Sequence, residues 1–395
     1  MNAKRLGALA AAVLGLGLLS APSSAAPPAK GTPHFYSIDV GSEIAGATDT
    51  FVASLAPTGG DPPYVIVGSY LDTAGDRQGF IAHLTSSYQL ADATTMSAPA
   101  ASSWTYPTSV NQDGTSVGFY LELGTGVSYG FVRTATGDLT TGLHPSDADT
   151  SGTTDVLFMS APTYGDPLAL GTFPEHITDE GLVTGFYTAP DTTGAVPFAV
   201  HGFTWQDGTF TAPIDQPGTL QTMLLGVTPA GMQYGGATVP DVKRDTATGK
   251  GLTISTNHKG ESVYTNYVDT ATTERLPSGF CGWTQLTGAT DTGLMVGNAG
   301  NGCAIYHYAW TLRGGKYTNF VYVDPVTATP AQQTLITGIT PTGIITGGYV
   351  TGWSETGTNW LSPSSYFTYY DEQLDQAYLQ RTDFGHWHGF IQTPN

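Results

Sequence analysis

Apolar and aromatic residues along this chain come in short runs of strand length, such as residues 117–120 (VGFY), and a glycine or proline interrupts nearly every longer stretch. No heptad repeat and no sustained helical period survives this punctuation. The 51 glycines and 25 prolines supply turns, while the hydrophobic fraction of 40% is enough to fill a sizeable core. The pattern predicts an all-β protein and argues against helical bundles and doubly wound α/β folds.

A turn followed by a glycine-containing strand recurs through the chain. Each turn has the form x-[Asp/Pro]-x-Gly, and in five copies a second glycine follows four residues later. An Asp or Pro suits the first central position of a type I turn, and the glycine accepts the positive φ that closes a hairpin. The strand glycines are Gly68, Gly118, Gly185, Gly235, Gly297 and Gly347, at intervals of 50, 67, 50, 62 and 50 residues. Six repeated units are the simplest count.

Each unit continues with two further strands. The third strand lies near a Gly-Phe pair or its equivalent, at positions 79–80, 130–131, 202–203, 251–252, 308–310 and 389–390. A fourth, aromatic strand ends at an aspartate in several units, over residues 210–215, 264–269 and 320–324. Four short antiparallel strands in a unit of roughly 50 to 65 residues have the dimensions of a propeller blade. We predict an all-β, six-bladed β-propeller of four-stranded antiparallel blades, with seven blades as the alternative.

The two ends of the chain predict how the ring closes. Residues 35–41 resemble residues 210–218, which hold the fourth strand of an internal unit, whereas the last unit stops after its third strand at residues 388–391. The N-terminal strand would then complete the final blade and remove the sheet edges of an open array. The prediction is a single propeller domain over residues 34–395.

These motifs resemble those of secreted bacterial proteins with the extracellular HAF repeat, in which a turn, a Val-Gly-x-Tyr strand and a His-Ala/Gly-Phe strand recur. The His-led triplets at residues 201–203 and 388–390 carry the resemblance, and its coverage extends over residues 34–395. The resemblance implies export and a β-propeller fold, and it brings no established reaction.

The N-terminus has the features of a secretory signal peptide. Two basic residues precede an apolar run over residues 6–19, and Ala25 ends a small-residue cleavage site. We predict a signal peptide over residues 1–25, a linker over residues 26–33 and a product that is secreted to the extracellular space or the periplasm. No later apolar run approaches the roughly 20 residues of a membrane-spanning helix.

The charge balance excludes one class of partner. The chain has 13 Lys and Arg against 32 Asp and Glu, for a net charge of −19, and loss of the two basic residues in the signal peptide gives 11 − 32 = −21. A basic nucleic-acid binder is therefore excluded. The expected partner is an extracellular glycan or a small-molecule ligand, and we expect a monomer.

The two cysteines, Cys281 and Cys303, fall in connections on the same face of the predicted propeller. In an exported chain, an even pair of cysteines is more often a disulfide than a metal or redox site. The sequence therefore predicts a disulfide between them.

The long connections of the predicted blades gather on one face, which we expect to carry the function. The longest connection, residues 350–386, is rich in aromatic residues, and aromatic rings on loops suit sugar rings. The candidate ligand-binding residues are Trp353, Trp360, Tyr370 and Trp387, with Tyr129 and His307 from the positions that lead third strands. The alternative interpretation is that the aromatic residues form extra strands with a small core of their own.

Catalysis on the same face is the rival interpretation. Asp371 and Glu372 are the nearest approach to the paired carboxylates of a glycoside hydrolase, and His201 or His388 would serve as the base of a polysaccharide lyase. Adjacent acids on a loop are commonly solvated, and a repeated histidine is commonly a hydrogen-bonded structural post. Three functions stay open: glycan binding, polysaccharide cleavage, and a structural or protein-binding role at the surface.

One acidic stretch has the spacing of a calcium loop. Asp147, Asp149, Ser151 and Asp155 place oxygen ligands at positions 1, 3, 5 and 9, with a glycine for the sharp turn. The stretch resembles the Asp-rich loops of integrin-type propellers, although Phe158 stands where an EF-hand has its glutamate. Ca²⁺ is therefore the one candidate cofactor, and the alternative is a Thr/Ser/Asp-rich loop without a metal.

Several catalytic motifs do not occur in the sequence. It contains no phosphate-binding Gly-x-x-x-x-Gly-Lys, no Gly-x-Ser-x-Gly and no His-Glu-x-x-His. Nucleotide hydrolysis, esterase activity and zinc proteolysis therefore have no support.

Overall fold

The computed structural model describes residues 33–98, 103–122, 124–151, 170–190, 199–217, 219, 221–239, 253–255, 263–268, 284–301, 304–331, 333–350, 366–371, 376–381 and 387–394. Over these residues the fold is all-β, as the sequence predicts, with one short 3₁₀ helix, η1 (Val40–Ser42). No helix in this part of the chain is long and apolar enough to cross a membrane.

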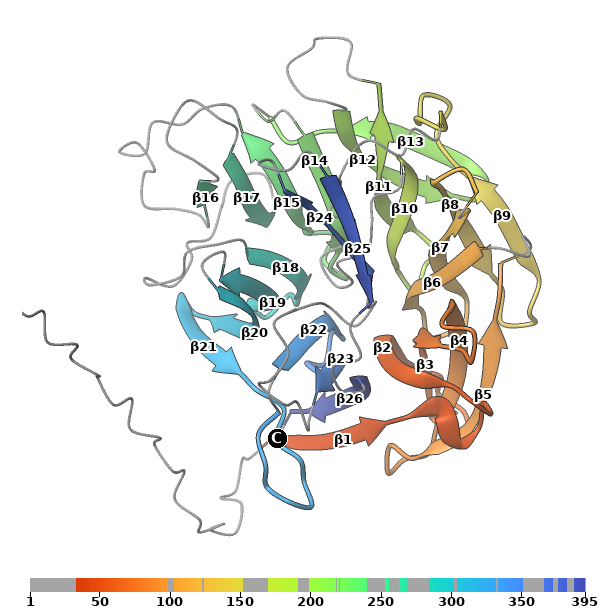
Figure 1. Ribbon diagram of the computed structural model, residues 1–395, viewed down its shortest axis with the longest axis vertical. Helices are drawn as coiled ribbons and strands as arrows, with labels where there is room; N and C mark the ends of the chain where they lie inside the picture. Colours follow the sequence, from red (N-terminus) through yellow and green to blue (C-terminus); the bar gives the residue numbers. More distant parts are fainter. Residues whose placement is uncertain are drawn as a thin grey trace, which may run out of the picture. The chain divides into compact units, whose positions relative to one another are not determined.

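Except for one separate hairpin, the described strands form six antiparallel groups of four (Figure 1). We number these groups 1 to 6 in the order in which their first strands follow along the chain. Group 1 contains β2 (Thr48–Pro57), β3 (Tyr64–Leu71), β4 (Arg77–Leu84) and β5 (Leu90–Met96). Group 2 contains β6 (Ser103–Val110), β7 (Ser116–Glu122), β8 (Val127–Arg133) and β9 (Leu139–Leu143). Group 3 contains β10 (Leu170–Ile177), β11 (Val183–Ala189), β12 (Ala199–Gln206) and β13 (Thr209–Ile214).

The second half of the chain forms groups 4 to 6. Group 4 contains β14 (Gln221–Val227), β15 (Gln233–Val239), β16 (Thr253–Ser255) and β17 (Val263–Val268). Group 5 contains β18 (Thr284–Ala289), β19 (Leu294–Asn301), β20 (Ala304–Arg313) and β21 (Lys316–Phe320). Group 6 contains β22 (Gln333–Ile339), β23 (Ile345–Val350), β26 (Trp387–Thr393) and, at its outer edge, β1 (His34–Ile38).

Two pairings lie outside this pattern. A short parallel pairing of β10 with β8 joins groups 2 and 3 into one eight-stranded sheet. β24 (Tyr366–Asp371) and β25 (Gln376–Arg381) form a separate antiparallel hairpin. This hairpin confirms that the aromatic connection over residues 350–386 contains extra strands.

Group 4 corrects the predicted strand order. The sequence predicts a fourth strand over residues 264–269, but β17 pairs with β15 in the third position, and β16 lies at the outer edge. All of β17 pairs with β15, whereas β16 contains only three residues for a ladder. The longer ladder takes the inner position, because it satisfies more backbone hydrogen bonds there. The predicted third strand at residues 251–252 lies outside the described residues.

The first strand of every group carries a β-bulge at the same place. At this place a register shift leaves one residue unpaired: Ala53, Thr108, Glu175, Leu225, Thr287 and Thr337. β2 has a second register shift, between Thr48 and Phe51. Each bulged residue lies six positions before the glycine of the turn that follows. The first strands contact one another in order from β2 through β6, β10, β14 and β18 to β22, and β22 contacts β2. The six bulges therefore belong to strands that surround a common space.

The second-strand glycines allow the bulged strand to approach closely. A Cβ atom on Gly68, Gly118, Gly185 or Gly347 would overlap the carbonyl oxygen that lies two residues before the bulge of its own group. On the other side, each of these glycines pairs across the ladder with the phenylalanine of a Gly-Phe pair: Phe80, Phe131, Phe203 and Phe390. In these groups, the glycine of the second strand and the Gly-Phe pair of the third strand therefore take part in the same contact.

The third-strand glycines allow the next group to pack. A Cβ atom on Gly79, Gly130, Gly202 or Gly389 would lie 2.7 to 2.9 Å from the side chain just before the next group's bulge. Those side chains are Pro107, Pro174, Leu224 and Val52. In groups 1, 2, 3 and 6, the repeat therefore uses one glycine for packing within the group and another for packing against the next group.

The turns after the first strands have the predicted geometry. Gly114, Gly181, Gly231, Gly293 and Gly343 have φ values between +78° and +90°. Each donates its N–H to the carbonyl oxygen three residues earlier. The expected type I turns, closed by a left-handed glycine, are confirmed.

The N-terminal strand completes group 6, which confirms the predicted pairing of the chain ends. β1 pairs antiparallel with β26 along its whole length. Ile38 and Val40 are buried in a cluster that they share with group 1. The ring of Tyr36 lies 4.7 Å from that of Tyr88, which belongs to the connection between β4 and β5. The first strand therefore ties the last group to the first.

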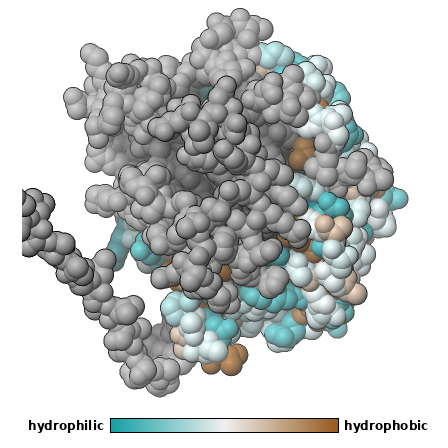
Figure 2. All heavy atoms as spheres, in the orientation of Figure 1, coloured by the Kyte–Doolittle hydropathy of each residue, from teal (hydrophilic) through white to brown (hydrophobic). Residues whose placement is uncertain are grey.

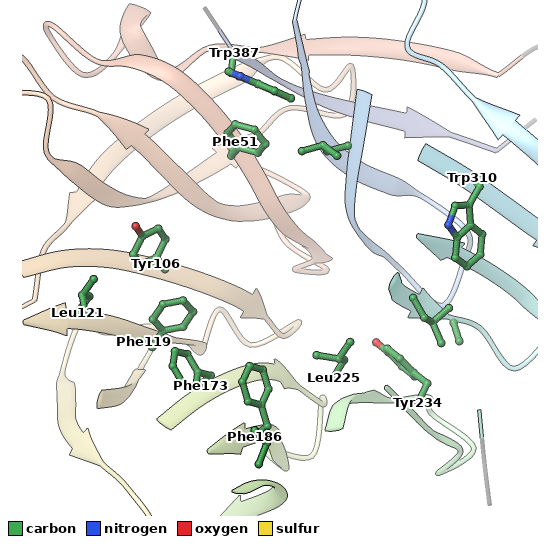
Figure 3. Close-up of a cluster of buried hydrophobic side chains, with 14 of the residues drawn as sticks. Phe51, Tyr106, Phe119, Leu121, Phe173, Phe186, Leu225, Tyr234, Trp310 and Trp387 are labelled. Carbon is green, nitrogen blue, oxygen red and sulfur yellow. The ribbon is translucent and has the colours of Figure 1, made fainter. Parts of the chain in front are cut away.

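A cluster of buried side chains draws on all six groups (Figure 3). It is rich in aromatic rings, and neighbouring strands of a group stack them in pairs, with centroids 4.9 Å apart for Tyr106 and Phe119 and for Phe173 and Phe186. Phe51 and Trp387 form a similar pair between groups 1 and 6. This core lies between the groups and holds them together.

We expect Gly347→Ala to destabilise the protein, because the added methyl group would overlap the Leu335 carbonyl oxygen and meet the Phe390 ring. Overpacking of a core costs about 1 to 3 kcal/mol, and overlap with backbone belongs at the upper end. Gly124→Ala is the control, since a Cβ atom there has no neighbour within 4 Å. Urea denaturation of both variants measures the difference, and equal midpoints would contradict this account.

Ile38→Ala tests the closure by β1. The side chain is 1% exposed, so its truncation should cost about 2 to 5 kcal/mol of unfolding free energy. Val326→Ala is the control, because Val326 is 90% exposed. Thermal unfolding followed by circular dichroism compares the two, and a loss of stability confined to Ile38→Ala is the expected result. An unchanged melting curve for this variant would mean that the packing of β1 contributes nothing to the stability of the fold.

Candidate functional site

The described surface offers few large apolar side chains. Those that are more than about a third exposed are Leu139, Val321, Val323 and Val326. On the face in Figure 2, apolar side chains of the described residues are scattered singly among polar ones. The coloured residues of this face therefore form no broad apolar patch, and single exposed side chains of this kind are ordinary.

The space that the six first strands surround contains a cavity of about 340 Å³. All six bulged residues line it, together with the turns that follow β10, β14 and β22. Its volume lies at the lower end of the range for small-molecule sites. Because the bulges lie in the C-terminal halves of the first strands, the cavity is on the side of the short turns, opposite to the long connections that the sequence favours.

Glu175 is the one charged residue among the six bulged positions. Protein atoms surround its side chain, and burial raises the pKa of its carboxyl group to about 8. Its Oε1 atom is buried and has no hydrogen-bond partner among the described residues. The remainder of the side chain is half-buried and lines the cavity. The carboxyl group is thus held in its neutral form at neutral pH.

His176 follows Glu175 and also lines the cavity. Burial lowers the pKa of its imidazole to about 4, although the charge of Asp179 partly opposes this shift. Its Nδ1 atom is buried without a hydrogen-bond partner in the described part of the chain. Two adjacent residues therefore hold unsatisfied polar atoms at the wall of one cavity, which is unusual in a native interior.

Tyr234 closes the cavity from group 4. Burial, and then the charge of Glu175, raise the pKa of its hydroxyl group. Its ring occupies the space that a Cβ atom of Gly226 would need. The hydroxyl group of Tyr234 therefore stays protonated at any physiological pH.

The bulged threonines use their protons on the protein. Thr108 Oγ1 donates to the Pro174 carbonyl oxygen at 2.8 Å, and Thr337 Oγ1 donates to the Val52 carbonyl oxygen at 2.6 Å. Both acceptors precede the bulge of the next group. A hydroxyl oxygen that has donated its proton still has lone pairs, so these side chains offer the cavity hydrogen-bond acceptors.

The charge of the cavity wall is acidic. Asp179 and Glu180 lie in the exposed turn after β10 and line the cavity beside Glu175. No Lys or Arg is among the described residues that line the cavity. The described part of the cavity wall therefore offers several acceptor oxygens and no cationic side chain.

His201 and His388, the histidines that the sequence singles out, each bind an aspartate at the far side of their groups. His201 Nδ1 lies 2.8 Å from Asp215 Oδ1, and His388 Nδ1 lies 2.9 Å from Asp39 Oδ2. These hydrogen bonds raise the pKa of both histidines, and burial opposes the rise. The pairs tie third strands to the ends of fourth strands, which fits the interpretation as structural posts. Because the pKa of each histidine is raised in the folded protein, the two His–Asp pairs stabilise the fold at low pH. This contribution is lost as the pH rises through the folded-state pKa.

Two residues predicted to bind ligand take part in packing. Trp387 is 4% exposed and lies 4.9 Å from Phe51, so its ring is in the core and offers no surface platform. Tyr129 is half-buried and stacks on Tyr120, with centroids 5.6 Å apart. Burial is the main cause that raises the pKa of the Tyr129 hydroxyl group.

Other predicted site residues lie wholly or partly outside the described residues. Tyr370 and Asp371 belong to β24, and His307 belongs to β20, where backbone pairing alone is described. The remaining residues, outside the description altogether, are Trp353, Trp360, Glu372, Asp155, Cys281 and Cys303. The disulfide and the long-loop ligand face therefore stay predictions.

The described part of the predicted calcium loop is held by its own hydrogen bonds. Asp147 Oδ2 accepts a hydrogen bond from the Tyr187 hydroxyl group at 3.0 Å, and Asp149 Oδ1 accepts one from the Ser151 backbone N–H at 2.9 Å. The described residues contain no cluster of three or more His, Cys, Asp or Glu side chains that would hold a metal. Without Asp155 in view, the calcium loop stays a prediction.

One position of the sequence repeat indicates the cavity residue Glu175, although this position belongs to none of the motifs described above. When the repeats are aligned on the turn glycine, the residue six positions earlier is Glu175 in group 3. In the other five groups this residue is Ala, Thr or Leu. A charged residue at one copy of an otherwise uncharged inner position marks a departure from the repeat. The bulge that brings this position to the cavity is visible only in the ladder pairing.

Comparisons with known proteins add little. No family model matches the chain, and no curated protein matches its sequence. Among solved structures, it is similar to a "putative gluconolactonase", with 14% identity over 89% of this chain and 95% of the other, at a TM-score of 0.34. It is also similar to the fucose-specific lectin from Aleuria aurantia, with 10% identity over 77% of this chain and 89% of the lectin, at a TM-score of 0.34. Likenesses this weak decide neither fold nor function.

Replacement of Glu175 by Gln should change how stability depends on pH. The pKa of Glu175 is about 8 in the folded protein, far above its usual 4.5, so the folded state binds more protons than the unfolded state between these values. The wild type should therefore lose stability across this interval relative to Glu175→Gln, by on the order of 5 kcal/mol at pH 9.

Urea denaturation from pH 4 to pH 9 measures this difference, with Glu43→Gln, at an exposed position, as the matched control. Parallel pH profiles for the wild type and Glu175→Gln would show that the carboxyl group is not held neutral in the folded protein.

Proposed function

We propose that this chain is an exported, six-bladed β-propeller of the HAF-repeat type that binds a small, hydroxyl-rich ligand in its axial cavity, in the simplest case a sugar unit of an extracellular glycan. In this proposal each group of four strands is a blade, and β1 is the last strand of the sixth blade. The successive contacts of the six first strands, and the contact of β22 with β2, support the ring. The pairing of β1 with β26 supports its closure.

The observation that carries the binding function is the composition of the cavity wall. Acceptor oxygens of Thr108, Thr337 and Glu175 line the cavity together with apolar side chains such as Leu225 and Ile339. A sugar offers hydroxyl donors on its edges and C–H groups on its faces, so both kinds of wall find a partner.

The cavity gives less support to the catalytic alternatives. A lyase that cleaves uronate polymers needs a cation for the substrate carboxylate, and the described lining contains no Lys or Arg. A glycoside hydrolase needs a second carboxyl group opposed to the first across the substrate. The other described carboxyl groups of the lining, Asp179 and Glu180, belong to the turn after β10, the strand that carries Glu175. Glycan binding is therefore the function that this site supports best, and the long-loop face remains a further candidate surface.

Titration of the chain from residue 26 onward with a panel of mono- and disaccharides, followed by isothermal calorimetry, tests the proposal. Thr342→Trp should weaken binding at least tenfold, because Thr342 is exposed and lines the cavity at the turn after β22. Thr292→Trp is the matched control, since Thr292 has the equivalent turn position in group 5 and does not line the cavity.

Three outcomes would count against this function. Failure of every sugar to bind would reject it, and full binding by Thr342→Trp would move the site away from the cavity. New reducing ends or unsaturated products would make the protein an enzyme.

A further inference from the structure

We infer that the ligand of the axial cavity carries a protonated amine, and that the Glu175 carboxylate is the group that pairs with it. This inference rests on the proposed function, since it names the chemical class of ligand for the same cavity. It points to an amino sugar rather than to a neutral or an acidic sugar.

The position of Glu175 is the first step. A bulged residue is released from the ladder, and in this fold each bulged residue lines the cavity. The other five positions hold Ala, Thr or Leu, so nothing in the fold itself requires a carboxyl group there. Thr108 fixes the peptide just before the bulge through its 2.8 Å hydrogen bond to the Pro174 carbonyl oxygen. The carboxyl group is thus held on a rigid strand at the axis.

The second step is that the described residues provide no hydrogen-bond partner for the buried Oε1 atom of this carboxyl group. None of the described residues that line the cavity is a Lys or Arg. The neighbouring His176 is kept neutral by burial. A buried carboxyl group without a partner reduces stability, and such a group persists in native proteins mainly where function needs it.

The third step is the match between an ammonium group and this wall. An ammonium group has three donors and no acceptor, and the cavity offers acceptors from Glu175 and from threonines that have already donated their protons. A carboxylate ligand would instead face Glu175, Asp179 and Glu180 with no cation between them. The site therefore favours cations over neutral ligands, and neutral ligands over anions.

The proton balance of binding follows from the state of the empty cavity. Because the pKa of Glu175 is about 8 there, the carboxyl group is protonated at neutral pH. When an ammonium ligand binds, the Glu175 carboxyl group ionises and releases its proton to solvent. The ammonium group of the ligand keeps its three protons. Affinity for an amine should therefore rise from pH 6 toward pH 8, as long as the amine stays protonated.

Isothermal calorimetry with glucosamine, glucose, N-acetylglucosamine, glucuronate and cyclohexylamine tests this inference. We expect glucosamine to bind at least tenfold more tightly than glucose or N-acetylglucosamine at pH 7, and glucuronate to bind least. Titrations in two buffers of different ionisation enthalpy should show release of about one proton for each glucosamine bound.

Glu175→Gln should bring the ratio of glucosamine to glucose affinities close to one and abolish proton release. Glu43→Gln, at an exposed position outside the cavity, should keep both. Circular dichroism and a melting curve check that each variant is folded, and the affinity ratio within one variant is independent of the fraction of folded protein.

The ligands separate this inference from the proposed function. Tight binding of glucose with no preference for glucosamine would overturn the amine inference and keep the sugar site. Binding of cyclohexylamine that depends on Glu175, with no binding of any sugar, would support the amine inference and overturn the sugar site. No binding by any of the five compounds would overturn both.

Discussion

The close approach of each bulged first strand to the second strand of its own group is the contact on which the rest of the structure depends. At Gly347, for example, the Leu335 carbonyl oxygen takes the place of a side chain, and the Phe390 ring covers the same glycine from the other side. A bulge strengthens the local twist of a strand. Groups 1, 2, 3 and 6 can therefore turn far enough to accept the first strand of the next group against the glycine of the third strand.

This constraint explains why much of the fold can be predicted from the sequence and why part of it cannot. Residues that enable close approach, such as Gly118 and Gly185, cannot be exchanged, so the repeat stays visible along the chain. The pairing of the chain ends is readable for the same reason. The strand order of group 4 depends on ladder length, and the burial of Trp387 depends on which neighbour meets Phe51, so neither is written in a local motif.

The candidate site follows from the same geometry, but its chemistry does not. A bulge at an equivalent position in every group places six side chains around one space, and the backbone needs nothing from these side chains beyond their size. Glu175 can therefore differ from its counterparts without any change in the repeat that surrounds it. In this fold, recognition is carried by a residue that the scaffold does not depend on, which a search for repeated motifs passes over.

The place of β1 in group 6 also constrains the order of events during synthesis. β1 contains the first described strand residues of the chain, and its partner β26 contains the last. The sixth group is therefore incomplete until β26 has been synthesised, and the cluster of Ile38 and Val40 lacks Ile391 until then. A growing chain can form groups 1 to 5 one after another, whereas β1 keeps an unpaired edge until β26 emerges, which exposes it to non-native pairing during synthesis.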